Sequence, residues 1–275
     1  MNGNLDYPPA FKHRQPKVER LIMRYAPLLS PVLNFLIPGK RKAHRLLVAN
    51  KRTAEALPTS PCNPKVLTIP ENGVTAEFKR MDLERDSNKT RYIFVGGLEP
   101  YKAVDIVIEA FANLPNHEGK ELYIVGKGRE AENLKQLAVN YNVYHKTVFL
   151  GHLSHVELVK QLSLADIFVF PSLDDCGGAV ILEAMALELP IIASNWGGPI
   201  DYVDPSCGIL IDPNSHASFV SGFTEAMELL AHNLSLRIKM GNAGRQKVEE
   251  KYTWAKKAEQ LLEIYDQAIL ELRDC

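Results

Sequence analysis

From Arg91 onward the chain alternates short, continuous apolar runs with longer amphipathic ones. The apolar runs end at glycine or proline, which is typical of strands whose two faces are both covered. We predict strands at 91–97, 121–126, 147–151, 166–172, 190–195 and 208–213. Helical spacing predicts intervening helices at 105–114, 129–141, 155–165 and 179–187. The alternation implies right-handed βαβ units, and therefore an α/β fold with a doubly wound, Rossmann-like parallel sheet.

Helical spacing dominates after Asn214, whereas the first 60 residues are rich in proline and contain no βαβ unit. We predict C-terminal helices at 216–232, 235–252 and 253–273, with Thr253 as the N-cap of the last one. Near the N-terminus we predict a lone strand within 44–50 and a short helix within 51–58.

We therefore divide the chain into three parts. Residues 1–63 form a basic N-terminal segment, the remnant of an incomplete domain. Residues 64–252 form the Rossmann-like domain, and 253–275 form a helix that would cross back to an N-terminal domain.

Composition and cysteine spacing narrow the class of protein. Apolar residues make up 46% and charged residues 24%, which excludes a disordered, collagen-like or disulfide-built chain. No apolar run reaches the roughly 18 residues of a membrane-spanning helix, and the opening residues lack the apolar core of a secretion signal. The four cysteines form no C-x-x-C pair, so a zinc or redox site is not indicated and a cytoplasmic location is expected.

The net charge of −1 hides an uneven distribution. Residues 1–56 carry 11 Lys/Arg against 3 Asp/Glu, which is +8, and the rest carries 21 against 30, which is −9. Between 12 and 52, basic clusters flank an apolar stretch at 28–37. Two interpretations stay open: attachment to an anionic surface at the inner membrane face, or a solvated remnant of a domain. No reading helix or aromatic-lined basic sheet is present, so no nucleic acid partner is expected.

The richest chemistry lies in residues 171–199. Two aspartates follow a strand that ends at Pro171, and Gly177-Gly178 then precede a helix that starts near Ala179. Glycines allow close backbone approach, and a helix N-terminus offers free N–H groups, so this is an anion site suited to phosphate. Carboxylates beside phosphate cost electrostatic energy, which indicates that Asp175 and Glu183 bind hydroxyls instead. On spacing alone, a plain helix start with acidic residues is an equal alternative.

The same segment resembles a known family. Asp175-x7-Glu183 resembles the E-x7-E motif of family 4 retaining glycosyltransferases of the GT-B fold, and LEAMALELPIIAS resembles their LEAMA-x-G-x-PVIAS run. Gly197-Gly198-Pro199 with Asp201 resembles their GG-x-x-E turn. Residues 94–111 resemble VGRL-x-P-x-KG-x-D-x-LI-x-AF, and 69–74 resemble PNGVD. Residues 66–270 thus resemble the C-terminal, donor-binding half of such an enzyme.

The resemblance implies roles for individual residues. Glu183 would hold the ribose of a nucleotide sugar, Asp175 would reach donor-sugar hydroxyls through a side chain shorter than Glu, and Lys102 would neutralise the departing diphosphate. The family usually has an Arg where this chain has Gly97, so a bidentate phosphate donor is lost. The other implied substrate-binding positions are Gly96, Gly97, Gly126, Gly128, Leu153, Ser154, Cys176, Gly177, Gly178, Ala179 and Val180. No metal is expected.

Four other features have competing interpretations. GKGREA at 126–131 imitates a dinucleotide fingerprint, but the next strand ends without the required acidic residue, so we assign it to the nucleobase end of the cleft. His152 and His155 have no third ligand, which disfavours a metal. Cys176 has no paired histidine, which disfavours a nucleophile, and Trp196 suits packing better than sugar stacking.

The resemblance implies transfer of a hexose-type sugar from a nucleotide diphosphate sugar to a glycan or lipid-linked acceptor, in polysaccharide biosynthesis. A UDP-sugar is favoured, a GDP-sugar comes next, and no cofactor is needed. Residues 1–63 are too short for an acceptor half, so the chain is expected to be either a fragment of a longer enzyme or a subunit of a split enzyme, with a separate acceptor-domain subunit as a candidate partner. The alternative is a non-catalytic nucleotide-sugar-binding module. A sugar-nucleotide epimerase of the same fold ranks third, because its carboxylate and histidine pattern is not evident.

Overall fold

Six parallel strands form the centre of the larger part of the molecule, in the order β5-β4-β3-β6-β7-β8. The computed structural model describes residues 6–36, 39–55, 57, 65–75, 78–84, 86, 88–175 and 177–273. The strands are β3 (Thr90–Val95), β4 (Lys120–Val125), β5 (Thr147–Gly151), β6 (Ile167–Phe170), β7 (Ile191–Ser194) and β8 (Gly208–Ile211). All six predicted strands are confirmed, and every neighbouring pair in this sheet is parallel.

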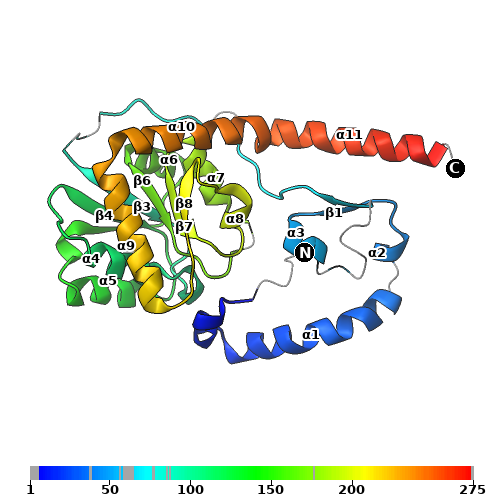
Figure 1. Cartoon of the computed structure of the whole chain (residues 1–275), viewed down its shortest axis with the longest axis horizontal. Coiled ribbons are helices and arrows are strands. Elements are labelled where there is room, and N and C mark those ends of the chain that lie inside the picture. The colour runs from blue at the N-terminus through cyan, green and yellow to red at the C-terminus, as the bar shows by residue number, and fades with distance from the viewer. Residues whose placement is uncertain are drawn as a thin grey trace.

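Helices cover both faces of this sheet (Figure 1). They are α4 (Val104–Ala112), α5 (Ala131–Asn140), α6 (His155–Leu164), α7 (Ala179–Ala186), α8 (Pro199–Tyr202), α9 (His216–His232), α10 (Leu234–Lys251) and α11 (Trp254–Arg273). On one side α4 packs against α5 and α9, and on the other α7 packs against α10. The doubly wound α/β fold is confirmed. So is the N-cap of α11, because the Thr253 hydroxyl accepts a hydrogen bond from the Lys256 N–H at 3.2 Å.

The strands are continuous apolar runs because neither face of the sheet meets water. Ile93, Phe168 and Ile192 have no exposed surface. The rings of Phe94 in β3 and Phe170 in β6 stack at 6.1 Å, which joins the two central strands through their side chains.

The strand order reverses between β3 and β6. The chain runs outward from β3 through β4 to β5, returns through α6 to β6, and then runs outward the other way. Helices α4 and α7 therefore leave β3 and β6 on opposite faces of the sheet. In doubly wound sheets, ligands bind at this topological switch point.

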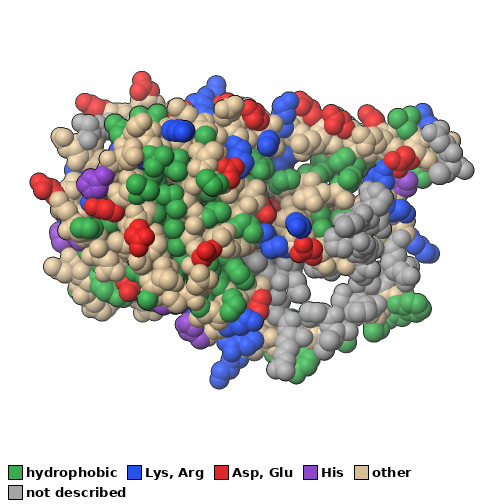
Figure 2. Space-filling view, in the orientation of Figure 1, with side chains coloured by type: hydrophobic (Ala, Val, Ile, Leu, Met, Phe, Trp, Pro, Cys, Tyr) green, Lys and Arg blue, Asp and Glu red, His purple; other side chains and the backbone are tan. Residues whose placement is uncertain are grey.

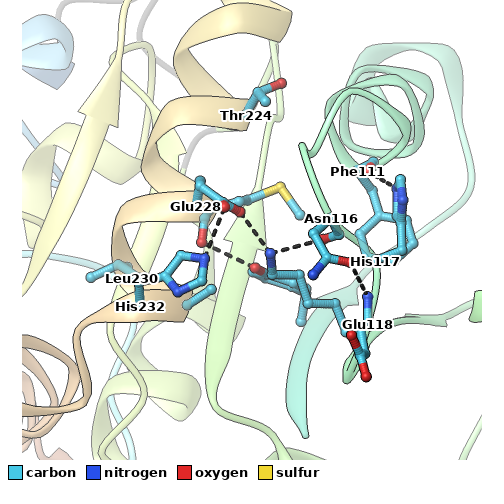
Figure 3. A network of polar contacts seen from close by, with 12 residues as sticks. Phe111, Asn116, His117, Glu118, Thr224, Glu228, Leu230 and His232 are labelled. Carbon is cyan, nitrogen blue, oxygen red and sulfur yellow. Dashed lines mark hydrogen bonds and ion pairs between the residues drawn. The ribbon is translucent and has the colours of Figure 1, made fainter.

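The amino end of the sheet is closed by a polar network around Lys120, the first residue of β4 (Figure 3). Lys120 is 5% exposed, and its Nζ donates to the Asn116 carbonyl and to Glu228 Oε2, both at 2.8 Å. The second Glu228 oxygen meets His232 Nε2 at 2.8 Å. These contacts satisfy a nearly buried ammonium group and fix α9 to the loop before β4.

The N-terminal residues form a separate set of elements. They are the 3₁₀ helix η1 (Pro9–Arg14), α1 (Lys17–Leu36), α2 (Gly39–Lys42), β1 (Leu46–Val48), α3 (Lys51–Glu55) and β2 (Val66–Thr68). The prediction of a lone strand within 44–50 is wrong, because β1 pairs in parallel with β2 and Leu46 lies opposite Val66. The apolar run of β2 is too short to predict by itself. The short helix within 51–58 is confirmed as α3.

Two long helices extend away from the six-stranded sheet, α1 along the lower edge and α11 along the upper edge of Figure 1. The sequence did not predict α1, because Pro27 and Pro31 lie inside it and proline normally interrupts a helix. Among the described residues, no helix has both the length and the apolar character needed to cross a membrane.

Candidate functional site

The switch point brings Lys102 and Asp175 together. Lys102 ends the 3₁₀ helix η2 (Pro100–Lys102) after β3, and Asp175 follows β6. Lys102 Nζ forms an ion pair with Asp175 Oδ2, and the two side chains are 15% and 12% exposed. The same Nζ lies 5.2 Å from the ring centre of Phe170 and 5.3 Å from that of Tyr101. A carboxylate and two aromatic faces thus hold this cation in a largely desolvated place.

Asp175 also fixes the start of α7. Its Oδ1 accepts a hydrogen bond from the Gly178 N–H at 2.9 Å, and its carbonyl accepts one from the Gly198 N–H at 2.5 Å. Gly178 has φ of 51°, a left-handed conformation that favours glycine. The Asp175 carboxylate therefore pairs with the Lys102 ammonium group and accepts a hydrogen bond from the Gly178 N–H.

Glu183 lies one turn further along α7 and is half-buried. Burial raises the pKa of its carboxyl above the usual value, and nearby His155 opposes that shift. Among the described residues, no hydrogen bond or ion pair reaches this carboxylate. A half-buried carboxylate in this state gains free energy when a ligand supplies hydroxyl donors.

Glycines allow the backbones of the loops after β3, β4 and β5 to approach each other closely. Gly126 has φ of 144°, and a Cβ placed there would lie 1.8 Å from the Gly96 carbonyl oxygen. A Cβ on Gly128 would lie 2.3 Å from the Leu98 carbonyl oxygen. The Gly126 N–H donates to the Gly151 carbonyl at 2.8 Å. Close approach of three loops therefore requires glycine at 126 and 128.

Gly97 is different, because a Cβ there would find its nearest neighbours at 3.9 Å, on the Glu99 side chain, and 4.0 Å, at the Lys127 carbonyl. Its φ is not in the left-handed region. The backbone does not require glycine at 97, and the position has room for a larger side chain.

Leu153 and Ser154 follow β5, the strand next to β4 in the sheet. Ser154 caps α6: its N–H donates to Glu157 Oε2 at 2.9 Å, and its Oγ accepts from the Glu157 N–H at 3.4 Å. Leu153 packs against the core. The polar groups of Ser154 are therefore engaged within the protein, which leaves it less able to bind a ligand than the sequence predicts.

The segment after β2 lies against the first turn of α7. A Cβ on Gly177 would fall 2.2 Å from Asn72 Nδ2 and 2.8 Å from Glu71 Oε1. Ala179 is exposed and Val180 half-buried, and they begin α7, where helical N–H groups have no partner within the helix. Cys176 lies outside the described residues. In the described part of the chain, no group of three His, Cys, Asp or Glu residues is placed to hold a metal.

The N-terminal arm, residues 6–15, docks on the same edge of the sheet. Trp196 Nε1 donates to the Asp6 carbonyl at 2.9 Å and so holds the start of the arm in place. Phe11 is fully buried and meets a ring of α9 edge-on at 5.6 Å. Arg14 pairs with Asp105 through two hydrogen bonds of 2.8 and 2.6 Å. These contacts join residues about 90 to 210 positions apart, and local sequence patterns give no signal for them.

Asp174 is an acidic group at this site for which sequence analysis predicts no separate role. Burial raises its pKa to about 6, and the negative charges of Glu19 and Asp175 add to the shift while Lys102 opposes it. The arm contributes to the burial at this edge, because Tyr7 is 3% exposed and interacts electrostatically with Asp174. The adjacent Asp175 instead has the Lys102 partner.

A sequence model of the family described as glycosyl transferases group 1 matches residues 75–247. The chain belongs to this family. A GDP-mannose-dependent monoacylated alpha-(1-6)-phosphatidylinositol monomannoside mannosyltransferase of Corynebacterium glutamicum is 33% identical over 175 residues, which is 61% of this chain and 44% of that protein. The chain spans about half the length of the curated relatives it matches.

Solved structures confirm the fold of this glycosyl transferases group 1 chain. Sucrose-phosphate synthase from Thermosynechococcus elongatus superimposes with a TM-score of 0.75 at 22% identity, covering 98% of this chain and 67% of that one. Anabaena HepE, solved in complex with UDP and glucose, gives a TM-score of 0.71 at 16% identity, covering 89% and 68%. The resemblance to GT-B glycosyltransferases is confirmed.

In this family member, the described candidate residues follow four neighbouring strands at one sheet edge. Gly96, Gly97 and Lys102 follow β3; Gly126 and Gly128 follow β4; Leu153 and Ser154 follow β5; Asp175, Gly177, Gly178, Ala179, Val180 and Glu183 follow β6. Their roles toward a ligand stay predictions, as do the domain boundaries.

We expect the free energy of unfolding to fall by up to about 2 kcal/mol as pH rises from about 4 to 6, because Asp174 holds its proton in the folded state. Between the pKa of Asp174 in the unfolded chain and its higher pKa in the folded chain, the folded chain binds more protons. The stabilisation is therefore fully present below the unfolded pKa, and it is lost as pH rises through the folded pKa. Urea unfolding at several pH values, compared with Asp174→Asn, measures this. Equal pH slopes for the two proteins would contradict it.

Proposed function

We propose that this chain is the donor-binding part of a retaining, metal-independent glycosyltransferase. It moves a hexose-type sugar from a nucleotide diphosphate sugar to a glycan or lipid-linked acceptor. The observation that carries the proposal is the meeting of Lys102, Asp175 and the first turn of α7 at the switch point of the sheet. A cation and free helix N–H groups suit a diphosphate, and the neighbouring carboxylates suit sugar hydroxyls.

Each group has a role in this proposal. Lys102 and the N–H groups of Ala179 and Val180 bind the diphosphate, and Glu183 accepts hydrogen bonds from the ribose. Asp175 holds Lys102 before the donor arrives. When the diphosphate takes over as the partner of Lys102, one carboxylate oxygen becomes available to a hydroxyl of the donor sugar.

The proposed reaction develops negative charge on the diphosphate leaving group, next to Lys102 and the N-terminus of α7. The bond between the anomeric carbon and the diphosphate oxygen breaks, and the acceptor oxygen bonds to the anomeric carbon on the same face. The acceptor proton passes to the departing diphosphate. Lys102 and the α7 N-terminus stabilise the negative charge that develops on the leaving group, so the chemistry needs no metal.

Support for the donor class comes from the relatives. The Anabaena structure contains UDP and glucose, and the Corynebacterium relative is named GDP-mannose-dependent. We infer a UDP-sugar first and a GDP-sugar next, with no other cofactor and a cytoplasmic role in polysaccharide biosynthesis.

The acceptor side requires a further surface. The small sheet of β1 and β2 has two strands, and Leu47, in the middle of β1, is 44% exposed. Parallel strands are normally buried on both faces, which supports an acceptor domain that completes this sheet. A non-catalytic nucleotide-sugar-binding module is the second candidate. Gly97 in place of the usual Arg and the direct pairing of Asp175 with Lys102 favour it.

Calorimetric titration with UDP, GDP, ADP and their sugar conjugates tests the proposal. One nucleotide should bind, and Glu183→Ala should weaken binding about tenfold or more, since hydrogen bonds to a charged group are lost. Glu132→Ala on the exposed face of α5 is the matched control. Binding without sugar transfer in the presence of an acceptor subunit would favour the non-catalytic module. Absence of binding to every nucleotide would contradict both candidates.

A further inference from the structure

One face of α1 consists of exposed apolar side chains. They recur at the three- and four-residue spacing of a helix face, and each is 48–71% exposed: Val18, Leu21, Ile22, Tyr25, Leu29, Val32 and Leu36. The face runs the whole length of this 20-residue helix. An apolar surface of this extent on a folded protein marks a contact with a partner or a membrane.

Positive charge surrounds this face. Residues 12–52 contain 11 Lys and Arg and a single acidic residue, Glu19. Lys17 stands at the first turn of α1, and α2, with Lys40 and Lys42, follows its end. Within the described residues, Lys17 and Lys42 are exposed and make no ion pair. Figure 2 shows Lys and Arg side chains gathered where η1 meets α1. Cationic groups thus flank the apolar face at both ends.

The other extended helix has no excess of positive charge. α11 also exposes apolar side chains, including Leu262 at 63% and Tyr265 at 61%. Its charged residues nearly balance, with Glu259, Glu263, Asp266 and Glu271 against Lys256, Lys257 and Arg273. An anionic surface would therefore attract the segment around α1 more strongly than α11.

We infer that α1 is an interfacial helix that binds the surface of a membrane containing anionic lipids. Its apolar face enters the boundary between headgroups and acyl chains, and the flanking lysines pair with lipid phosphates. The helix lies in the plane of the membrane. The inference uses no residue of the donor site, so it stands independently of the proposed function.

The test is flotation of the full chain with lipid vesicles. The chain should bind vesicles of phosphatidylcholine with about 30 mol % phosphatidylglycerol much more strongly than pure phosphatidylcholine, and salt at about 0.5 M should weaken the binding. The double variant Ile22→Gln with Leu29→Gln should reduce partitioning at least about tenfold. The matched control is Leu262→Gln with Leu270→Gln on α11, which removes equally exposed side chains and should leave binding unchanged.

The charge contribution has its own variant, Lys17→Glu with Lys42→Glu, which should abolish the preference for anionic vesicles while the urea unfolding midpoint stays the same. Three results would overturn the inference: no binding of the unaltered chain to anionic vesicles, equal binding by the Ile22/Leu29 variant, or equal loss in the α11 control. Sedimentation velocity can give a fourth result that would overturn it. A dimer that this α1 variant dissociates, without vesicle binding, would assign the face to a second copy of the chain.

Discussion

Replacing Lys102 with alanine should lower the affinity of the chain for its nucleotide diphosphate sugar about 100-fold. The substitution removes a charge-assisted contact to the diphosphate, worth about 1.5–3 kcal/mol. It also leaves the Asp175 carboxylate, 12% exposed and without its cation, close to where the diphosphate would bind. Repulsion between these two negative groups adds to the loss, and together about 3 kcal/mol corresponds to the stated change in dissociation constant.

Titration calorimetry measures the effect, and three comparisons sharpen it. Affinity for the nucleoside without phosphates should stay unchanged, because Lys102 acts on the diphosphate. The double variant Lys102→Ala with Asp175→Asn should recover part of the loss, since it removes the repulsion and keeps an oxygen to accept the Gly178 N–H. Lys160→Ala, on the exposed side of α6, is the matched control. An equal loss for nucleoside and nucleotide would refute the diphosphate role.

The parts of the fold that the sequence predicts are those with local causes. β3 and β6 are continuous apolar runs because helices cover both faces of the sheet, and α11 begins directly after Thr253 because the Thr253 hydroxyl caps it. The Lys102–Asp175 ion pair also has a cause that the sequence predicts. Lys102 comes a few positions after β3 and Asp175 a few positions after β6, and these two strands are neighbours in the sheet.

What escaped prediction depends on contacts between distant residues. The hydrogen bond from Trp196 to the Asp6 carbonyl joins residues that are 190 positions apart in the sequence. No sequence pattern around either residue predicts this contact. The pKa of Asp174 is raised mainly by burial, and the negative charge of Glu19, distant in the sequence, adds to the shift. Helix α1 escaped because Pro27 obscures an apolar spacing that is otherwise helical.

Replacing Gly126 with alanine should destabilise the fold by about 3 kcal/mol or more, which is at the high end for a single substitution. Its φ of 144° is one that residues with a Cβ rarely adopt. The added Cβ would lie 1.8 Å from the Gly96 carbonyl oxygen, which is backbone and cannot rotate away. The loops after β3 and β4 must therefore separate. Their separation breaks the 3.0 Å hydrogen bond from the Gly96 N–H to the Val125 carbonyl.

Gly97→Ala provides the matched control for this substitution. It adds the same methyl group to a neighbouring loop, where the nearest atoms lie 3.9 and 4.0 Å away and φ is unstrained. We expect its free energy of unfolding to stay within about 0.5 kcal/mol of the unaltered chain. Urea unfolding of the three proteins at one pH decides the matter. Coinciding midpoints for Gly126→Ala and Gly97→Ala would show that the loops can separate at little cost, and that the close approach at Gly126 does not hold the sheet edge together.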